Sequence, residues 1–581
     1  MQTQEKQPLS PPARKHQKRI TVNTSATQYE IITEIAKSFN WRTKSIEDED
    51  DESDLIWTDN TVQPERFCRL KPYQKINHFP NMHELARKNY LAKNLNKMKK
   101  LFPNDFNFYP KTWIYPAEYP SLKLQATPKT VYIVKPEASC QGKGIFLTQN
   151  LEVFADNERY VIQEYMKNPL LINGLKFDLR IYVFVAGCDP LKVYIHKEGL
   201  ARFATEKYCP PGSSNFDNAC MHLTNYAINK THENFVFNYD SAVDNVGHKQ
   251  SLRALFSKIE GLGYNIESIW SDIKDIVVKS IVTVQPSLAH VYKACQPDDP
   301  YNGICFELLG FDIILDSSGK PWLLEVNHSP SFNTDSPLDL KIKKKVISEA
   351  LILANINTDA RKEYEERKKK QILLRTLANS RGQEKETKIQ DFKSAQLKRS
   401  LWESSHLNGF ELIFPTFEQK YQNFVEGALK IWVESTGRKI QNKDRPQTQD
   451  SAQKIFSLNR RTLSSERKPD LEVFQRLYKT KRVKVDPPPV APCFQLDEAF
   501  RTQYFRKENP YSFIELVVPT NKEKARFKRM PKKRVSVKSH LDEVLKERRV
   551  WEKKTFSFHD TPMKIFSVLT DFTPKFVSNN Y

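Results

Sequence analysis

The sequence lacks the features of a secreted, disulfide-bonded or membrane-spanning protein. Its eight cysteines are scattered and form no CxxC pair, so they indicate neither a disulfide framework nor a zinc site. No run of about 18 apolar residues is present, so we expect no transmembrane helix. Met1 to Ile20 are polar and basic without an apolar stretch, and we expect no secretory signal. A reducing, cytosolic setting follows.

Apolar residues are fewer than in most globular proteins, whereas charged residues are abundant. Hydrophobic residues make up 39% of the 581 positions, 28% are charged and 34 are proline, which predicts that part of the chain is not packed. Lys and Arg number 91 against 70 Asp and Glu, a net charge of +21. Such a chain is expected to seek polyanions, whether nucleic acid, an acidic membrane or acidic protein tails.

Strand-like and helix-like segments intermix between about residues 20 and 350, which predicts an α/β or α+β core. An amphipathic helix is expected at 81–101 and another helix at 266–293. The expected strands, apart from the hairpin described below, are 20–23, 131–134, 160–163, 178–185 and 192–195.

The composition changes after about residue 355. Residues 341–400 hold 17 Lys or Arg against 8 Asp or Glu, and 361–370 is expected to form a solvated helix with i,i+4 ion pairs. After about residue 430 the chain is polar and carries prolines, with a second basic cluster at 522–538. We expect disorder there.

Two apolar runs, 311–315 and 322–326, flank a four-residue polar turn and predict a β-hairpin. Folding this hairpin about its centre places Asp312 opposite Glu325, and Asn327 shares their face. Oxygen donors without His or Cys suit Mg²⁺. From the spacing alone, an ordinary hairpin with polar residues facing water remains the alternative.

A glycine-rich turn follows the strand that ends at Lys135. Its residues are Gln141, Gly142, Lys143 and Gly144. Backbone N–H groups in such a turn can approach phosphate, and the lysines add positive charge. The turn is no Walker A motif, because GxxxxGK[ST] is absent. A plain hairpin turn is the alternative.

Two more strands carry polar groups. The residues 163–166 close a strand and could offer backbone groups to an adenine edge, although an ordinary edge strand would look the same. Lys176, Asp178 and Arg180 alternate on one face of the next strand. Burying three charges without a ligand or mutual pairing is costly, so they indicate a site, with a structural ion-pair network as the alternative.

Taken in order, these segments resemble the tubulin tyrosine ligase-like family. The motifs that carry the resemblance are Lys135 with 141–144, then 163–166, 176–183, 222–227 and 323–331. The family has an ATP-grasp fold, in which two α+β units clasp ATP. The segments 75–80 and 225–230 look most like its polyglutamylase branch, which carries a basic helical microtubule-binding extension.

The resemblance implies a division of the chain into four parts. A disordered basic tail would occupy 1–19, and the ATP-grasp core would occupy 20–355. The basic helical extension would span 357–425, and a mostly disordered tail would span 426–581.

The resemblance also implies a role for each matching residue. Arg180 and Glu325 would be catalytic, and Mg²⁺ would be held by Asp312, Glu325 and Asn327. The nucleotide would be contacted by Lys135, Gln141, Gly142, Lys143, Gly144, Gln163, Glu164, Tyr165, Met166, Lys176, Phe177, Asp178, Thr224 and Asn225. The incoming amino acid would be bound by Arg202, Tyr226, Ala227, Lys249 and Lys343.

The implied enzyme is an ATP-dependent tubulin polyglutamylase, an acid–amino-acid ligase. ATP would phosphorylate a glutamate carboxylate on a tubulin C-terminal tail, and the amine of free L-glutamate would attack this acyl phosphate. The expected cofactors are ATP and Mg²⁺, and the expected partner is tubulin or the microtubule. The charge of +21 fits that partner, because tubulin tails are rich in glutamate.

Other functions stay open on sequence grounds. A tubulin glycine ligase of the same family is the nearest, and a catalytically inactive microtubule-binding protein is the second. A nucleic-acid partner is not expected, because the basic segments lack interleaved aromatics and any recognisable module. We further expect no membrane partner, a monomer, and a location in the cytoplasm and cytoskeleton, with the cilium and basal body as further candidates.

Overall fold

The computed structural model describes residues 19–437, apart from 46–50, 138–140, 155–157, 241, 298, 300–301, 378–380 and 417. Side chains are described for the same residues except 371 and 374–389. The expected tails at 1–19 and 426–581, including the second basic cluster, therefore lie almost wholly outside the described residues. Among the described residues, no helix is both long enough and apolar enough to cross a membrane.

The N-terminal part of the described chain is a small parallel sheet with strand order β2-β1-β3-β4. The expected strand at 20–23 is confirmed within β1. Its strands and helices are β1 (Thr21–Ala26), α1 (Glu30–Ser38), β2 (Arg42–Lys44), β3 (Leu55–Thr58), α2 (Pro64–Arg69) and β4 (Lys75–Ile76).

A second sheet is antiparallel, with strand order β5-β8-β6-β7. The glycine-rich turn joins two of its neighbouring strands, β6 and β7, and the expected helix at 81–101 is split in two before it. The elements are α3 (His83–Ala86), α4 (Lys88–Leu101), β5 (Thr112–Tyr115), α5 (Tyr119–Gln125), β6 (Tyr132–Pro136), β7 (Phe146–Thr148), the 3₁₀ helix η1 (Leu151–Val153) and β8 (Tyr160–Glu164).

The largest sheet has seven strands, with β12-β11-β10-β13-β14 as its main path, β9 beside β10 and β15 beside β11. All of its neighbouring strands are antiparallel. Its strands are β9 (Leu171–Ile172), β10 (Leu175–Cys188), β11 (Leu191–Lys207), β12 (Lys249–Ser251), β13 (Glu307–Leu315), β14 (Pro321–Asn327) and β15 (Phe410–Phe414). The helices between them are α6 (Ala219–His222), α7 (Tyr226–Asn229), α8 (Leu252–Gly261), α9 (Ile266–Cys295) and α10 (Pro337–Leu353).

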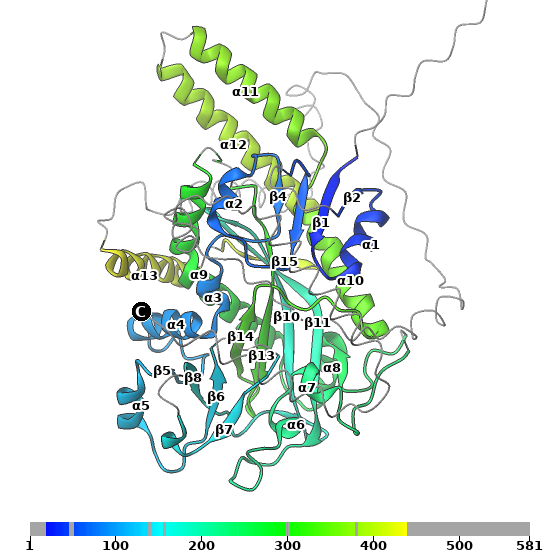
Figure 1. Cartoon of the computed structure of the whole chain (residues 1–581), viewed down its shortest axis with the longest axis vertical. Helices are drawn as coiled ribbons and strands as arrows, with labels where there is room; N and C mark the ends of the chain where they lie inside the picture. The colour runs from blue at the N-terminus through cyan, green and yellow to red at the C-terminus, as the bar shows by residue number, and fades with distance from the viewer. Residues whose placement is uncertain are drawn as a thin grey trace, which may run out of the picture. The chain divides into compact units, whose positions relative to one another are not determined.

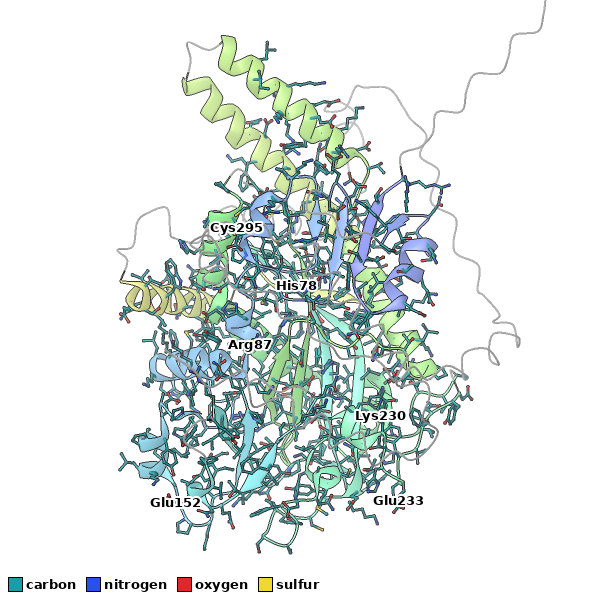
Figure 2. All side chains as sticks on the ribbon, viewed as in Figure 1. His78, Arg87, Glu152, Lys230, Glu233 and Cys295 are labelled. Carbon is teal, nitrogen blue, oxygen red and sulfur yellow. The ribbon has the colours of Figure 1, made fainter. Side chains whose placement is uncertain are left out.

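Strand β10 shows why this sheet is buried on both faces. Its alternate residues Leu179, Ile181 and Val183 pack in one apolar cluster with α9, whereas Tyr182 and Phe184 pack in another with α1 and α10. Successive residues of a strand point to opposite faces, so both sets need an apolar cover. Helices supply it on either side of the sheet (Figure 1), and side chains fill the space between (Figure 2).

The chain after α10 returns to the core. Two long helices, α11 (Asp359–Leu377) and α12 (Arg381–Ser405), are followed by β15, which pairs with β11, and by α13 (Gln419–Thr436), which packs against α9. The boundary expected at residue 425 therefore falls inside α13. Glu403 connects α12 to the core, because its carboxylate accepts hydrogen bonds from Lys192 and from the Tyr194 hydroxyl on β11. Arg399 forms an ion pair with Glu403 within α12.

Candidate functional site

Three oxygen-bearing side chains meet on the hairpin β13–β14. Asp312 lies opposite Glu325, as the spacing predicts, and the Asn327 Nδ2 lies 3.4 Å from an oxygen of each carboxylate. Amide nitrogen and oxygen are assigned from their surroundings, so a flipped Asn327 presents Oδ1 instead. This donor set, which we name the oxygen-donor end, fits a hard divalent cation such as Mg²⁺.

Two arginines already neutralise the buried Asp312. Arg180 forms a double contact with it, Nε to Oδ1 at 2.6 Å and Nη2 to Oδ2 at 3.0 Å, and Arg202 Nη2 lies 2.8 Å from Oδ2. Arg202 also pairs with the buried Asp178 through Nε, 2.9 Å from Oδ1. The ion-pair network that the sequence left as an alternative is thus present, and its members line a cavity.

The pKa values follow from burial and from these arginines. Burial alone would raise the pKa of Asp312, but the charges of Arg180 and Arg202 outweigh it and hold that pKa below its usual range. Burial raises the pKa of Asp178, which Arg202 opposes only in part. Asp312 is therefore ionised across the physiological range.

A cavity of about 960 Å³, counting the part open to solvent, lies between the β5-β8-β6-β7 sheet and the largest sheet. Most of the predicted nucleotide residues line it, together with Arg202 and the oxygen-donor end. They are Lys135, Gln141, Gly142, Lys143, Gln163, Glu164, Tyr165, Met166, Lys176, Asp178, Thr224 and Asn225. Gly144, Phe177 and Arg180 do not line this cavity.

Two buried lysines face the cavity. Lys135 Nζ donates to Gln163 Oε1 at 2.8 Å, and Lys176 Nζ donates to the Tyr165 hydroxyl at 2.9 Å and to the His222 carbonyl at 2.7 Å. Burial lowers the pKa of Lys135 to about 8 and that of Lys176 to about 7. A polyanion entering the cavity would favour the charged form of both.

The glycine-rich turn approaches α7 closely. Gln141, Gly142 and Gly144 have φ of 59°, 84° and 69°, in the left-handed region. A Cβ on Gly142 would lie 2.5 Å from Ile228 Cδ1 and 3.2 Å from the side chain of Asn225. Glycine at 142 therefore permits both the turn and its contact with the segment that carries Thr224 and Asn225.

The predicted amino-acid residues gather around a carboxylate that the sequence analysis missed. Lys249 Nζ lies 2.6 Å from Asp339 Oδ2, and Lys343 Nζ lies 2.9 Å from Asp339 Oδ1. The Lys249 ammonium lies 3.6 Å from the centre of the Tyr226 ring. We name Asp339, Lys249 and Lys343 the lysine end.

Strand register links the two ends. Lys249 on β12 lies opposite Arg202 on β11, which lies opposite Asp178 on β10. Arg180, two residues along β10, lies opposite Asp312 on β13. A charged row thus crosses the sheet. Ala227 follows Tyr226 in α7 and is placed near the row by that neighbour.

Several residues of the site carried no signal strong enough to be assigned from sequence. His222 belongs to a quoted motif but received no role, and Lys88 lies between the segment 75–80 and Lys135 outside any motif, yet both line the cavity. Asp339 is the first-turn acid of α10 and lies four residues before Lys343, a spacing that could have indicated the pair.

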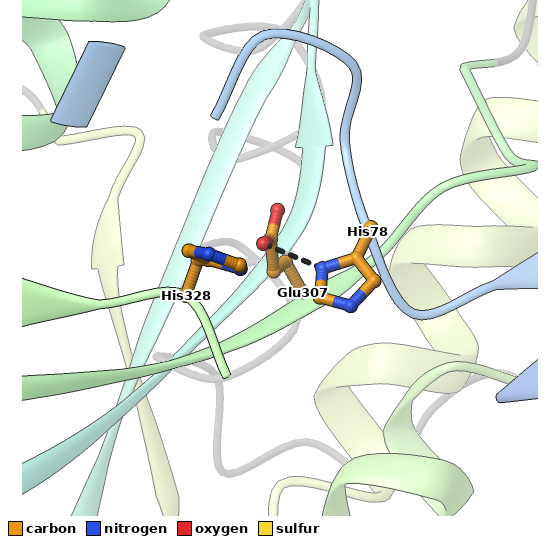
Figure 3. Close-up of side chains that lie close together, drawn as sticks. All are labelled: His78, Glu307 and His328. Carbon is orange, nitrogen blue, oxygen red and sulfur yellow. Dashed lines mark hydrogen bonds and ion pairs between the residues drawn. The ribbon is translucent and has the colours of Figure 1, made fainter. Parts of the chain in front are cut away.

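A second polar cluster, His78, Glu307 and His328, has potential metal-binding atoms within 4.8 Å of one another (Figure 3). The potential ligand atoms of His78 and Glu307 already form hydrogen bonds within the protein, however. The two ring nitrogens of His78 lie 2.9 Å from Glu307 Oε1 and 2.9 Å from the Thr58 carbonyl, and Phe79 N donates to Glu307 Oε2 at 2.9 Å. The cluster therefore ties the segment after β4 to β13.

Comparisons with known proteins identify the family of the chain. The model of the Tubulin-tyrosine ligase family matches residues 67–364, just over half of the chain. A "Probable beta-tubulin polyglutamylase" of Tetrahymena thermophila is 48% identical over 440 residues, which cover 74% of this chain and 37% of that protein.

Two human relatives are similar over a comparable share of the chain. "Tubulin polyglutamylase TTLL6" is 42% identical over 413 residues, covering 70% of this chain and 45% of that protein. "Tubulin polyglutamylase TTLL13" is 42% identical over 434 residues, covering 73% of this chain and 52% of that protein. The chain thus spans about half, or less, of the length of these relatives. The family match, together with the site, shows that the chain belongs to the tubulin-tyrosine ligase family.

Proposed function

We propose that the protein is an ATP-dependent ligase that adds glutamate to glutamate side chains, or to chains already attached, on tubulin C-terminal tails. The observation that carries this proposal is the charged row across the central sheet. Oxygen donors lie at one end of it, two lysines with a buried carboxylate lie at the other, and a cavity with two desolvated lysines opens beside it.

ATP would bind in the cavity, in an ATP-grasp arrangement with the small antiparallel sheet on one side and the large sheet on the other. Lys135, Lys143 and Lys176 would neutralise the phosphates. The N–H groups of Glu164 and Tyr165 donate to the carbonyls of Lys111 and Val131. We therefore assign adenine recognition to the N–H of Met166 and to the carbonyl groups of this strand end.

Asp312, Glu325 and Asn327 would hold Mg²⁺. When bound, the ion would supply positive charge beside the transferred phosphoryl group. Arg180 is held against Asp312 by two hydrogen bonds, so its guanidinium is fixed near the same place. A fixed cation that does not reorganise during the reaction is the arrangement that stabilises developing charge best.

The reaction balances without a covalent protein nucleophile. An acceptor carboxylate oxygen attacks the γ-phosphorus of ATP, ADP leaves, and an acyl phosphate forms. The amine of free glutamate then attacks the acyl carbon, the new C–N bond forms, and phosphate leaves as the amine loses a proton. The chain's residues bind, orient and neutralise charge throughout.

Glutamate is the amino acid that the cations favour. Arg202, Lys249 and Lys343 would have a second carboxylate to bind in glutamate, whereas glycine has none. The names of the similar proteins point the same way. The basic helices α11 and α12 are proposed to bind the microtubule, and a cytoskeletal location, including the cilium, is proposed on the same grounds.

The test offers glutamate, glycine and tyrosine separately to the full-length protein with microtubules and Mg²⁺-ATP, and measures tubulin mass. We expect mass increments of glutamate alone, and none without ATP. Glycine increments would favour the glycine ligase instead. A wild-type protein that binds microtubules but adds no amino acid would favour an inactive microtubule-binding protein.

A further inference from the structure

The hydroxyl group of Tyr182 is a buried donor that has no hydrogen-bond partner among the described residues. The residue is 0% exposed. Tyr182 alternates with Asp178 and Arg180 along β10, so all three side chains lie on the same face of the strand. The unpartnered hydroxyl thus belongs to the face that carries the charged row.

Packing alone does not account for this hydroxyl. The ring lies in an apolar cluster with Phe184, Leu338 and Val346, where a phenylalanine would serve equally well. A buried polar group without a partner destabilises the folded state, so such groups are uncommon and call for a specific explanation.

Burial raises the pKa of the Tyr182 hydroxyl, and charges from both ends of the row also shift this pKa. These charges belong to Arg180, Asp339, Arg202 and Asp312. The carboxylates among them already form ion pairs, Asp312 with the two arginines and Asp339 with Lys249 and Lys343.

A carboxylate of the incoming amino acid would have to lie in this same region. The cations that would bind it are Arg202, Lys249 and Lys343, and each contacts a carboxylate of the protein, Asp178 for Arg202 and Asp339 for the two lysines. An entering carboxylate would take over one of those contacts. Its oxygens have more lone pairs than the cations alone satisfy, so a neutral O–H donor can bind it without adding charge to the site.

We propose that Tyr182 is a substrate-binding residue, whose hydroxyl donates a hydrogen bond to a carboxylate of the incoming amino acid. This inference rests on the proposed function and names a recognition group for it. It accounts for the retained hydroxyl, because the missing partner is the substrate.

The test is Tyr182→Phe, measured by the KM for glutamate, the KM for ATP and the thermal midpoint. We expect the KM for glutamate to rise about tenfold or more, the loss of one hydrogen bond to a charged group. The KM for ATP should stay within about twofold. The thermal midpoint should be unchanged or higher, since an unpartnered hydroxyl is removed.

Tyr194→Phe is the matched control. Tyr194 is also buried in the same apolar cluster, on the neighbouring strand β11, but its hydroxyl donates to Glu403 at 3.0 Å. Its loss should lower the thermal midpoint and leave the KM for glutamate unchanged. Tyr182→Phe should therefore change the KM for glutamate but not lower the thermal midpoint, whereas Tyr194→Phe should lower the thermal midpoint but not change the KM.

An unchanged KM for glutamate in Tyr182→Phe, or an equal rise for glutamate and ATP, would overturn the inference. A wild-type protein without ligase activity would instead overturn the proposed function. In that event calorimetric binding of L-glutamate to the ATP-loaded protein decides on Tyr182. Equal affinity of wild type and Tyr182→Phe, including no binding by either, would then refute its role.

Discussion

The two ends of the charged row are built in different ways. At the oxygen-donor end, Asp312, Glu325 and Asn327 all come from one hairpin, and each would have its own place around a cation. At the lysine end, Lys249 comes from β12 and Lys343 from α10, and both share the single carboxylate of Asp339. At the oxygen-donor end each group has a role that the others cannot fill, whereas at the lysine end two positive charges serve the same purpose.

This difference predicts different responses to mutation. Removing one oxygen donor should abolish a function that the other two cannot perform. Removing one cation at the lysine end should weaken binding, because the neighbouring cations remain. The experiments below test the contrast in order of expected effect.

The largest effect is expected from Glu325→Gln. The substitution keeps the size of the side chain but removes the charge that would hold Mg²⁺, so ligation should be lost while the fold is retained. Turnover with saturating substrates and the thermal midpoint are the two measurements. Glu411→Gln, at a half-buried pair with Lys274 away from the row, is the control and should stay active. Turnover of Glu325→Gln within about tenfold of wild type would refute the role of the oxygen-donor end.

Arg202→Ala should have the next largest effect, and it tests the middle of the row, where Arg202 contacts Asp178 and Asp312. The KM for glutamate should rise far more than the KM for ATP, since a charge-assisted contact with a carboxylate contributes roughly 1.5–3 kcal/mol. The structure adds a second expectation. Asp178 would lose its arginine partner while buried, so the thermal midpoint should also fall.

Arg202→Lys separates these two effects. It restores a positive charge near Asp178 without the double contact of a guanidinium, so stability should recover more than glutamate binding. If Arg202→Ala changed the KM for both substrates equally, Arg202 would be a structural ion-pair partner and not a glutamate-binding residue.

The hairpin β13–β14 is the part of the site that could be predicted from sequence, because its two strands are neighbours in the chain. Spacing predicts that Asp312 lies opposite Glu325, and it does. The turn pairs Leu315 with Pro321, a register that alone would place Asp312 opposite Leu324, and a bulge between Ile313 and Asp312 shifts the pairing to Glu325. The predicted pairing therefore holds only because the bulge offsets the length of the turn. The turn itself is 316–320, one residue longer than expected, because the Asp316 carboxylate accepts from the N–H groups of Ser318 and Lys320. Such capping is a detail that apolar spacing does not encode.

Contacts between residues far apart in the sequence could not be predicted from spacing. Arg202 faces Asp178 only because β10 and β11 pair in the register that places these two residues opposite each other. Asp339 contacts Lys249 only because α10 packs beside β12. The return of the chain in β15 and α13 was missed for the same reason. Their apolar residues are covered by β11 and α9, which lie far away in sequence.

The pH dependence of ATP binding tests the cavity beside the row, with a smaller effect. Lys176 and Lys135 have pKa values of about 7 and about 8, lowered by burial, and phosphate favours their charged forms. ATP affinity should therefore fall as the pH rises from 6.5 to 9, by at most about tenfold per lysine and pH unit. Calorimetry at pH 8 should detect proton uptake on binding.

The stability of the free protein should change with pH in the opposite direction to the ATP affinity. An unfolded lysine binds its proton up to about pH 10.4. Between about pH 7 and that value, the unfolded chain holds more protons at these positions, so stability should rise with pH. Lys176→Met should reduce both slopes. Affinity that increased with pH would show that these lysines do not contact the phosphates.

The smallest effect per residue is expected at α11, which contrasts with both ends of the row. Lys368, Lys369 and Lys370 are exposed, and exposed ion pairs contribute roughly 0–1 kcal/mol each. As a cluster they should hold an acidic lattice, with a strong salt dependence because exposed charges are screened. Replacing all three with alanine should reduce microtubule co-sedimentation and microtubule modification. Activity on a short free glutamate-rich peptide should survive, because the charged row lies in the core.

A charge-matched triple substitution separates a local effect from a change in net charge. It replaces exposed lysines on three other helices with alanine, namely Lys37, Lys123 and Lys430. Because both triple variants lower the charge by three, general attraction to an acidic lattice would weaken binding equally in the two. A docking role for α11 requires the larger loss in the α11 variant, and it requires that peptide activity be retained. Equal loss of peptide and microtubule activity would mean that α11 supports the core instead of docking the enzyme.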